Sequence, residues 1–81
     1  MTRDEMFALL TKNLKAKIKE LAQVEILEKH TPRDLGANSV TIAEAISLTM
    51  AQLKIKVSSD ALAKAQSIKD VLDLFEHPTI A

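Results

Sequence analysis

Apolar residues recur at helical spacing in the first part of the chain. Met6, Leu9, Leu10, Leu14, Ile18 and Leu21 fall at steps that place them on one side of a helix. Thr2 and Glu5 have the spacing of a capping box, in which each side chain satisfies a free backbone N–H group. We therefore predict an amphipathic helix that begins near Thr2. Its lysines at positions 12, 15, 17 and 19 lie mostly off this stripe, which favours a solvated face over a docking patch.

The periodicity stops between about Val24 and Asn38. Pro32 lacks an amide hydrogen and biases the preceding residue toward extended backbone, so a helix running through this segment is disfavoured. We predict a long loop, with Ile26 and Leu27 buried beneath it as anchors. A long irregular connection in a small domain is often functional.

A second helix is predicted from Val40 to about Leu53, after the bend at Gly36 and a cap at Asn38 or Ser39. Glu44 is its single charged residue before Lys54, and apolar residues surround its axis. They are Val40, Ile42, Ala43, Ala45, Ile46, Leu48, Met50, Ala51 and Leu53. Such a helix is either the buried centre of the domain or a helix with a partner-binding face, and the pattern leaves both open.

Two shorter helices are predicted in the last third of the chain. Ser58, Ser59 and Asp60 offer caps for a helix through Lys64, and Ser67 and Asp70 have capping-box spacing at the start of another. The inward stripe of that last helix is Ile68, Val71, Leu72 and Phe75, and Pro78 marks its end. Residues 55–57 form a linker. The predicted fold class is all-α: a four-helix, mostly antiparallel bundle with a long first loop and a short third helix.

Length and composition support one folded domain spanning residues 1–81. The chain is 47% hydrophobic and 27% charged, enough apolar content for a core. Eleven basic and eleven acidic residues give no net charge to attract nucleic acid or an anionic membrane. The chain has no cysteine for a disulfide or a catalytic thiol, and no apolar run long enough to cross a bilayer. We expect a soluble cytoplasmic protein, and Met1 suggests a complete one.

The candidate chemistry lies in the run Asp34-Leu35-Gly36-Ala37-Asn38-Ser39-Val40. A helix begins here, and its first N–H groups carry a partial positive charge. A phosphodiester on Ser39 would sit where anions are favoured, and we expect its hydroxyl to be exposed for modification. Ser39 as an ordinary helix cap is the plain alternative.

Catalysis and metal binding are weaker interpretations of the same residues. A Ser39–His30–Asp34 triad would lack the flanking glycines of a nucleophile elbow. His30 and His77 are far apart in the sequence and have no ligand cluster around either, so no metal site is predicted.

This run resembles the modification site of acyl carrier proteins, and the loop, second helix, linker and last helix fall at that family's spacing. The resemblance implies that the protein is not an enzyme. It implies that a phosphopantetheinyl transferase attaches 4′-phosphopantetheine from coenzyme A to Ser39, which also accounts for the missing cysteine. Asp34, Leu35, Gly36 and Asn38 match the loop that shapes the site. The implied partner-binding residues are Val40, Ile42, Ala43, Glu44 and Met50.

Three departures from the family pattern refine this expectation. Asn38 replaces the usual Asp, Thr41 and Ile42 lie in a stretch that is often acidic, and Pro32 replaces a bulky apolar residue. Docking would then depend more on apolar contact than on charge. This favours a polyketide carrier over a general fatty-acid carrier.

One further position bears on the kind of polyketide carrier. Acceptor carriers for a hydroxymethylglutaryl-synthase-like enzyme often have Trp six residues after the serine. Ala45 stands there in this chain, which favours the acetyl donor of β-branching.

Two other functions stay open at this point. The chain could be a cofactor-free helical adaptor that binds partners through the apolar second helix. It could also be a peptidyl carrier, although those commonly have Gly-Gly-His/Asp-Ser at the site. We expect a monomer that serves acyl-loading and polyketide synthase enzymes, with short acyl chains folding back against Ile46, Leu62 or Leu72.

Overall fold

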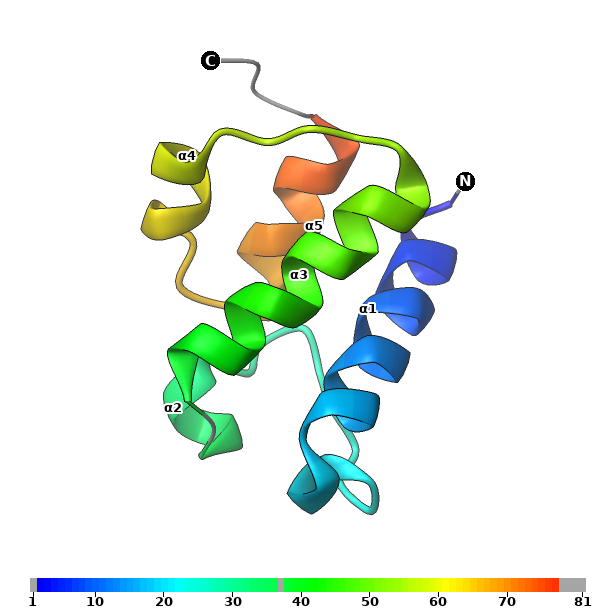
Figure 1. Ribbon diagram of the computed structural model, residues 1–81, viewed down its shortest axis with the longest axis vertical. Coiled ribbons are helices and arrows are strands. Elements are labelled where there is room, and N and C mark those ends of the chain that lie inside the picture. The colour runs from blue at the N-terminus through cyan, green and yellow to red at the C-terminus, as the bar shows by residue number, and fades with distance from the viewer. Residues whose placement is uncertain (1, 37, 78–81) are drawn as a thin grey trace.

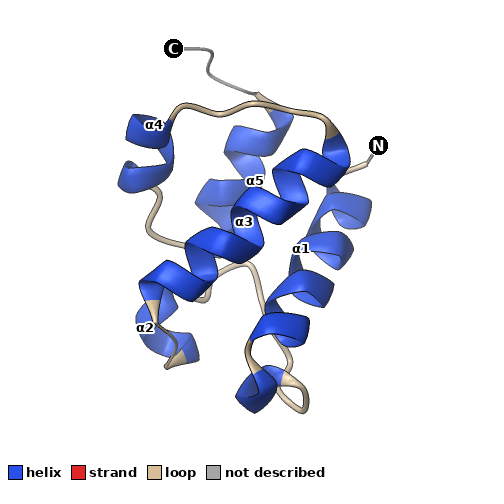
Figure 2. Ribbon diagram, viewed as in Figure 1, coloured by secondary structure: helices blue, strands red, loops and turns tan. Residues whose placement is uncertain are grey.

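The computed structural model describes residues 2–36 and 38–77, and every regular element within them is helical (Figure 2). The elements are α1 (Arg3–Lys17), the 3-10 turn η1 (Lys19–Leu21), α2 (Pro32–Leu35), α3 (Ser39–Leu53), α4 (Ser59–Lys64) and α5 (Ile68–Glu76). The all-α prediction is confirmed. The four predicted helices correspond to α1, α3, α4 and α5. The single turn α2 lies in the predicted loop, whereas η1 lies before it, at the end of the apolar stripe assigned to the first helix.

The four main helices alternate in direction along the chain. In Figure 1, α1 runs down the long axis, α3 rises obliquely across the molecule, α4 descends and α5 rises again. Helix α1 packs against both α3 and α5, and α4 packs against α5. The start of α3 and the end of α1 therefore lie at the same end of the long axis.

Among the described residues, the buried core is aliphatic apart from one aromatic ring, and Phe7 packs against this core from α1. Leu10, Leu14 and Leu72 are completely buried, and Phe75 joins them from α5. The predicted inward stripe of α5 is confirmed, since Ile68, Val71, Leu72 and Phe75 are all buried. Helix α1 ends at Lys17, earlier than its apolar stripe, because Ile18 has extended backbone. Ile18 and Leu21 nevertheless reach the core, from the residue that caps α1 and from η1.

A buried polar link joins α1 to α3. The Asn13 side-chain amide donates hydrogen bonds to Thr49 Oγ1 at 2.7 Å and to Gln52 Oε1 at 2.9 Å. Thr49 is completely buried, and its hydroxyl donates to the Ala45 carbonyl within α3 at 2.8 Å. Buried polar groups are costly unless paired, so these bonds favour one register of the two helices.

The loop that follows η1 is anchored differently from the prediction. Ile26 is buried, as predicted, but the prediction for Leu27 is wrong: its exposed fraction is 37%, against 5% for Ile26. Ile26 is therefore the loop's buried anchor between these two residues. Further on, backbone bonds hold the loop to the start of α5, with Ile68 N–H donating to the His30 carbonyl at 3.0 Å.

Most of the predicted caps are present. Thr2 and Glu5 form both bonds of their capping box, and Ser58 accepts from the Ala61 N–H group. At the start of α5 the box is incomplete: Ser67 accepts from Asp70 N–H, but the Asp70 carboxylate accepts from Gln66 N–H at 2.9 Å. Pro78, predicted to end this helix, lies outside the described residues. Among those residues, no helix combines the length and apolar character needed to cross a bilayer.

Candidate functional site

Helix α3 begins at Ser39, as the motif requires. Asn38 has extended backbone, and its side-chain oxygen accepts a 2.7 Å hydrogen bond from Val40 N–H. This confirms Asn38 as the N-cap, one of the two residues predicted for that role. The structure describes only the backbone of Ser39, so the predicted exposure of its hydroxyl falls outside the described atoms. Its backbone position is the first residue of a 15-residue helix.

The loop before Ser39 contains a capped turn of helix. Thr31 Oγ1 accepts from Asp34 N–H at 3.2 Å, and the Asp34 carboxylate accepts from Thr31 N–H at 3.0 Å. The hydrogen bond from the Thr31 backbone N–H group, and secondarily the Thr31 side chain, lower the pKa of the Asp34 carboxyl group below its ordinary range. Pro32 fits at the first helical position because no intrahelical bond needs its missing N–H group. Asp34 thus helps to cap the start of α2 through its hydrogen bonds with Thr31.

Leu35 and Gly36 turn the chain from α2 toward α3. Leu35 is buried in the core and fixes the end of α2. Gly36 has a φ of +64°, the left-handed region that residues with a β-carbon avoid. Nothing lies within 4 Å of the place a β-carbon would occupy, so the glycine serves backbone conformation and no close packing. Ala37, next in the motif, lies outside the described residues.

The outer surface of α3 is largely apolar and uncharged. Val40 is 64% exposed and Leu48 is 40% exposed, and Ala43 and Glu44 are also at the surface. Ile42 is only 5% exposed, which corrects its assignment to a partner-binding surface: it packs in the core. Met50 is half-buried against the core. Helix α3 is therefore both a central helix with a buried side and a helix with an exposed apolar side.

A cleft of about 470 Å³ opens between α3, α4 and α5. Its apolar lining includes Leu35, Ile42, Ile46, Leu62, Ile68 and Val71, and Ser47, Ser59 and Ser67 add hydroxyls. Ile46 and Leu62 were predicted to border such a space. Leu72 was predicted too, but it is completely buried and does not line the cleft. The cleft begins one turn after Ser39, at Ile42 and Ala43.

His30 and Asp34, the residues considered with Ser39 as a possible triad, form hydrogen bonds within the loop instead. His30 Nδ1 accepts from Leu27 N–H at 3.0 Å, and Asp34 is bonded to Thr31. Among residues 2–36 and 38–77, no three histidine, cysteine or carboxylate side chains gather as metal ligands would.

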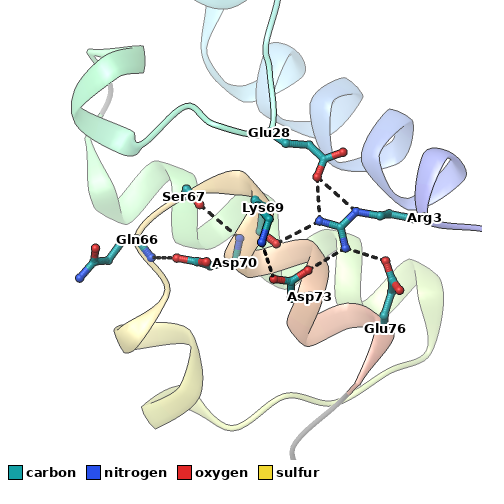
Figure 3. Close-up of polar contacts among 8 residues, drawn as sticks. All are labelled: Arg3, Glu28, Gln66, Ser67, Lys69, Asp70, Asp73 and Glu76. Carbon is teal, nitrogen blue, oxygen red and sulfur yellow. Dashed lines mark hydrogen bonds and ion pairs between the residues drawn. The ribbon is translucent and has the colours of Figure 1, made fainter.

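One charged cluster was not predicted from the sequence. The Arg3 guanidinium contacts Glu28, Asp73 and Glu76 at 2.7, 2.8 and 2.6 Å (Figure 3). These carboxylates raise the pKa of Arg3 well above its ordinary value. A signal was available: Arg3 is a cation at the start of its helix, while Asp73 and Glu76 are anions at the end of theirs. Each of these charges interacts unfavourably with the dipole of its own helix, and the pairing of Arg3 with the carboxylates compensates for this at both helix ends.

The comparisons with known proteins agree with this geometry. The family model described as phosphopantetheine attachment site matches residues 12–75. No curated protein matches the sequence significantly. Among solved structures, the fold matches a chain in the crystal structure of the curacin biosynthetic pathway HMG synthase in complex with acetyl donor-ACP. The TM-score is 0.80 at 27% identity, over 93% of this chain and 96% of that one. Because so small a chain covers nearly all of it, the matched component is the carrier.

The family match spans α3, the loop before it and most of the bundle, and α3 provides what a phosphate ester needs. Its first turn contains no acidic residue that would repel an anion. The first N–H groups of a helix lack intrahelical partners, and here they lie beside the residue at the motif position. The residues present therefore fit the prosthetic group. The chain belongs to the family of phosphopantetheine attachment-site proteins, carriers that present acyl groups on 4′-phosphopantetheine and are not themselves catalysts.

Proposed function

We propose that Ser39 is the residue that carries phosphopantetheine, within one carrier domain formed by residues 1–81. The observation that carries this proposal is the start of α3: a glycine bend, an Asn38 cap and then Ser39 at the first helical position. A phosphate ester there would lie at the positive end of a long helix. Asn38 and the α3 backbone would orient its base. When bound, the arm supplies a terminal thiol that holds the acyl group as a thioester.

We further propose that the acyl group is acetyl and that the partner is a hydroxymethylglutaryl-synthase-like enzyme of a polyketide pathway. Support comes from the likeness, over nearly the whole chain, to the carrier of the curacin complex. Further support comes from α3, where Val40, Ala43 and Leu48 form an exposed apolar surface beside the single acid Glu44. Docking through apolar contact, with little charge, suits this surface. The carrier acts as a monomer in the cytoplasm, where coenzyme A is available to the transferase.

Attachment at Ser39 is tested by mass. Incubation with coenzyme A and a broad-specificity phosphopantetheinyl transferase is expected to add one phosphopantetheine to the protein. Ser39→Ala should abolish this gain, whereas Ser47→Ala, at an exposed serine of the same helix, should keep it. A gain that persists in Ser39→Ala would place the group elsewhere. The absence of any gain in the wild-type protein would favour the cofactor-free adaptor.

The acetyl-donor role needs a second experiment. The modified carrier is loaded with acetyl, malonyl or aminoacyl groups and offered to the HMG synthase of the curacin pathway. Acetyl transfer to the enzyme, weakened by Val40→Asp and by Leu48→Asp, is the expected result, because a charge on the apolar surface must be desolvated on docking. Efficient loading of the aminoacyl group by a peptide-synthetase enzyme, without acetyl transfer, would point to a peptidyl carrier.

A further inference from the structure

The Arg3 cluster links three segments that are distant in the sequence. Arg3 lies at the start of α1, Glu28 in the loop after η1, and Asp73 and Glu76 on α5 (Figure 3). Two guanidinium nitrogens, Nε and Nη2, donate to Glu28 Oε1 at 3.2 and 2.7 Å. The third, Nη1, donates to Asp73 and Glu76. One planar side chain therefore divides its donors between the loop and α5, as only Arg can.

The loop segment that Arg3 holds is also fixed to α5 by its backbone. Lys69 N–H donates to the Glu28 carbonyl at 2.8 Å, and Ile68 N–H donates to the His30 carbonyl at 3.0 Å. These are among the first N–H groups of α5, which have no partner within the helix. Residues 28–30 thus satisfy the start of α5 through main-chain oxygens, while Arg3 holds the same segment through the Glu28 side chain.

This segment leads directly into the attachment loop. Thr31, which caps α2, follows His30 in the chain, and the Gly36 bend and the Asn38 cap come next. Within α2, Leu35 is the buried anchor. The path of residues 31–36 and the position of Asn38 are therefore set at three points: residues 28–30 at the beginning, Leu35 in the middle and the Asn38 cap at the end.

Resting on the proposed attachment at Ser39, we propose that Arg3 and Glu28 form a clasp that positions the loop before the attachment serine for its modifying and partner enzymes. Arg3 is a positioning residue in this role, since it acts through Glu28 and the loop. The bonds from Arg3 to Asp73 and Glu76 fix the guanidinium on α5. The bonds to Glu28 extend that fixed point to the loop.

A matched pair of variants separates positioning from stability. Glu28 and Glu76 are each bonded to Arg3, and their side chains are similarly exposed, at 37% and 33%. Glu28→Ala cuts the contact to the loop and keeps the backbone bond to Lys69. Glu76→Ala cuts a contact to α5 and leaves the loop untouched. Both variants, with wild type, are assayed for kcat and KM of phosphopantetheine transfer, thermal midpoint and backbone amide resonances.

We expect Glu28→Ala to raise KM for the carrier about twofold to fivefold, the range that corresponds to a partly exposed ion pair, and to shift the amide resonances of residues 31–36. Glu76→Ala should lower the thermal midpoint similarly without either effect. Equal kinetic changes in both variants, or unmoved loop resonances in Glu28→Ala, would overturn the clasp.

Glu28→Gln, which keeps the shape of the side chain, replaces Glu28→Ala if the latter does not fold. If the wild-type protein accepts no phosphopantetheine, the attachment proposal fails, and the loop resonances still test the clasp.

Discussion

Asn38 sets the geometry at which the attachment helix begins. Its extended backbone brings the chain out of the Gly36 bend, and its side chain takes the Val40 N–H group. Asp would cap equally well and would add a negative charge at the positive end of the helix. Asn caps without that charge, so the helix dipole stays available to a phosphate ester on the next residue.

Replacement of Asn38 should therefore affect stability and modification differently. Asn38→Ala removes the cap and is expected to cost about 1 kcal/mol in the free energy of unfolding, measured by urea denaturation. Asn38→Asp keeps the cap and should be at least as stable as the wild type before modification. In the phosphopantetheine form, that advantage of Asp should shrink, since two negative groups then share one helix end. An Asp variant whose advantage grows on modification would contradict this account.

Single-residue roles were predictable where they depend on near neighbours. The caps at Thr2, Asn38 and Ser58 need a partner two or three residues away, and the sequence displays such a pair directly. The errors at Leu27 and Ile42 have another origin. Both are apolar, but whether an apolar side chain lies inside or outside depends on where the neighbouring helices are, which no local pattern contains.

At the scale of elements, the contact between α1 and α3 combines leucine packing with one polar link. Asn13 on α1 meets Thr49 and Gln52 on α3, and Thr49 is in turn bonded to the Ala45 carbonyl. A shift of either helix by one residue would bury an amide without acceptors. The link therefore holds α3 with Val40 and Leu48 facing outward.

A double-mutant cycle tests the polar link. Thr49→Val removes the acceptor but keeps the side-chain shape, so it should cost about 1 to 2 kcal/mol because a buried Asn13 N–H group loses a partner. Asn13→Leu in the Thr49→Val background should recover at least half of this loss, since both polar groups are then gone. Urea denaturation of all four proteins gives the coupling energy. Additive costs would mean that the link contributes nothing beyond its separate side chains.

The elements themselves were mostly predictable, while the loop and cleft were less so. Periodicity and caps indicated α1, α3, α4 and α5, because each has its own signals. The single turn α2 was missed, since four residues show no periodicity. Pro32 was interpreted as a helix breaker, whereas it is the first residue of α2. The cleft is a product of three helices meeting. Ile46 and Leu62 could be guessed as its lining, but Leu72 could not be distinguished from them.

For the molecule as a whole, the Arg3 cluster compensates charges that are unfavourable within their own helices. The last turn of α5 has no basic residue, and it carries Glu76 after Asp73. Arg3 supplies the missing cation from the start of α1, and Lys69 lies 3.4 Å from Asp73 on α5 itself. Pairs separated by 25 and 70 residues in sequence have no local signature. The sequence shows that each charge opposes the dipole of its own helix, but only the folded arrangement shows which residues pair.

Because Arg3 is the main cause of the lowered pKa of Asp73, this cluster should make the fold sensitive to acid. A carboxylate whose pKa is depressed below its ordinary 3.8 stabilises the fold above that pH, and the contribution is lost as pH falls through the depressed value. Arg3→Gln should therefore be less stable than wild type at about pH 7, with the difference largely gone at about pH 2. Asp34 and Glu5, whose pKa values are also lowered, keep their bonds in both proteins. Lys69→Ala, which removes a smaller cause, should show a weaker pH dependence. Urea midpoints at the two pH values measure this. An Arg3→Gln deficit that is the same at both would mean that Arg3 contributes to stability without depending on the charge of the carboxylates.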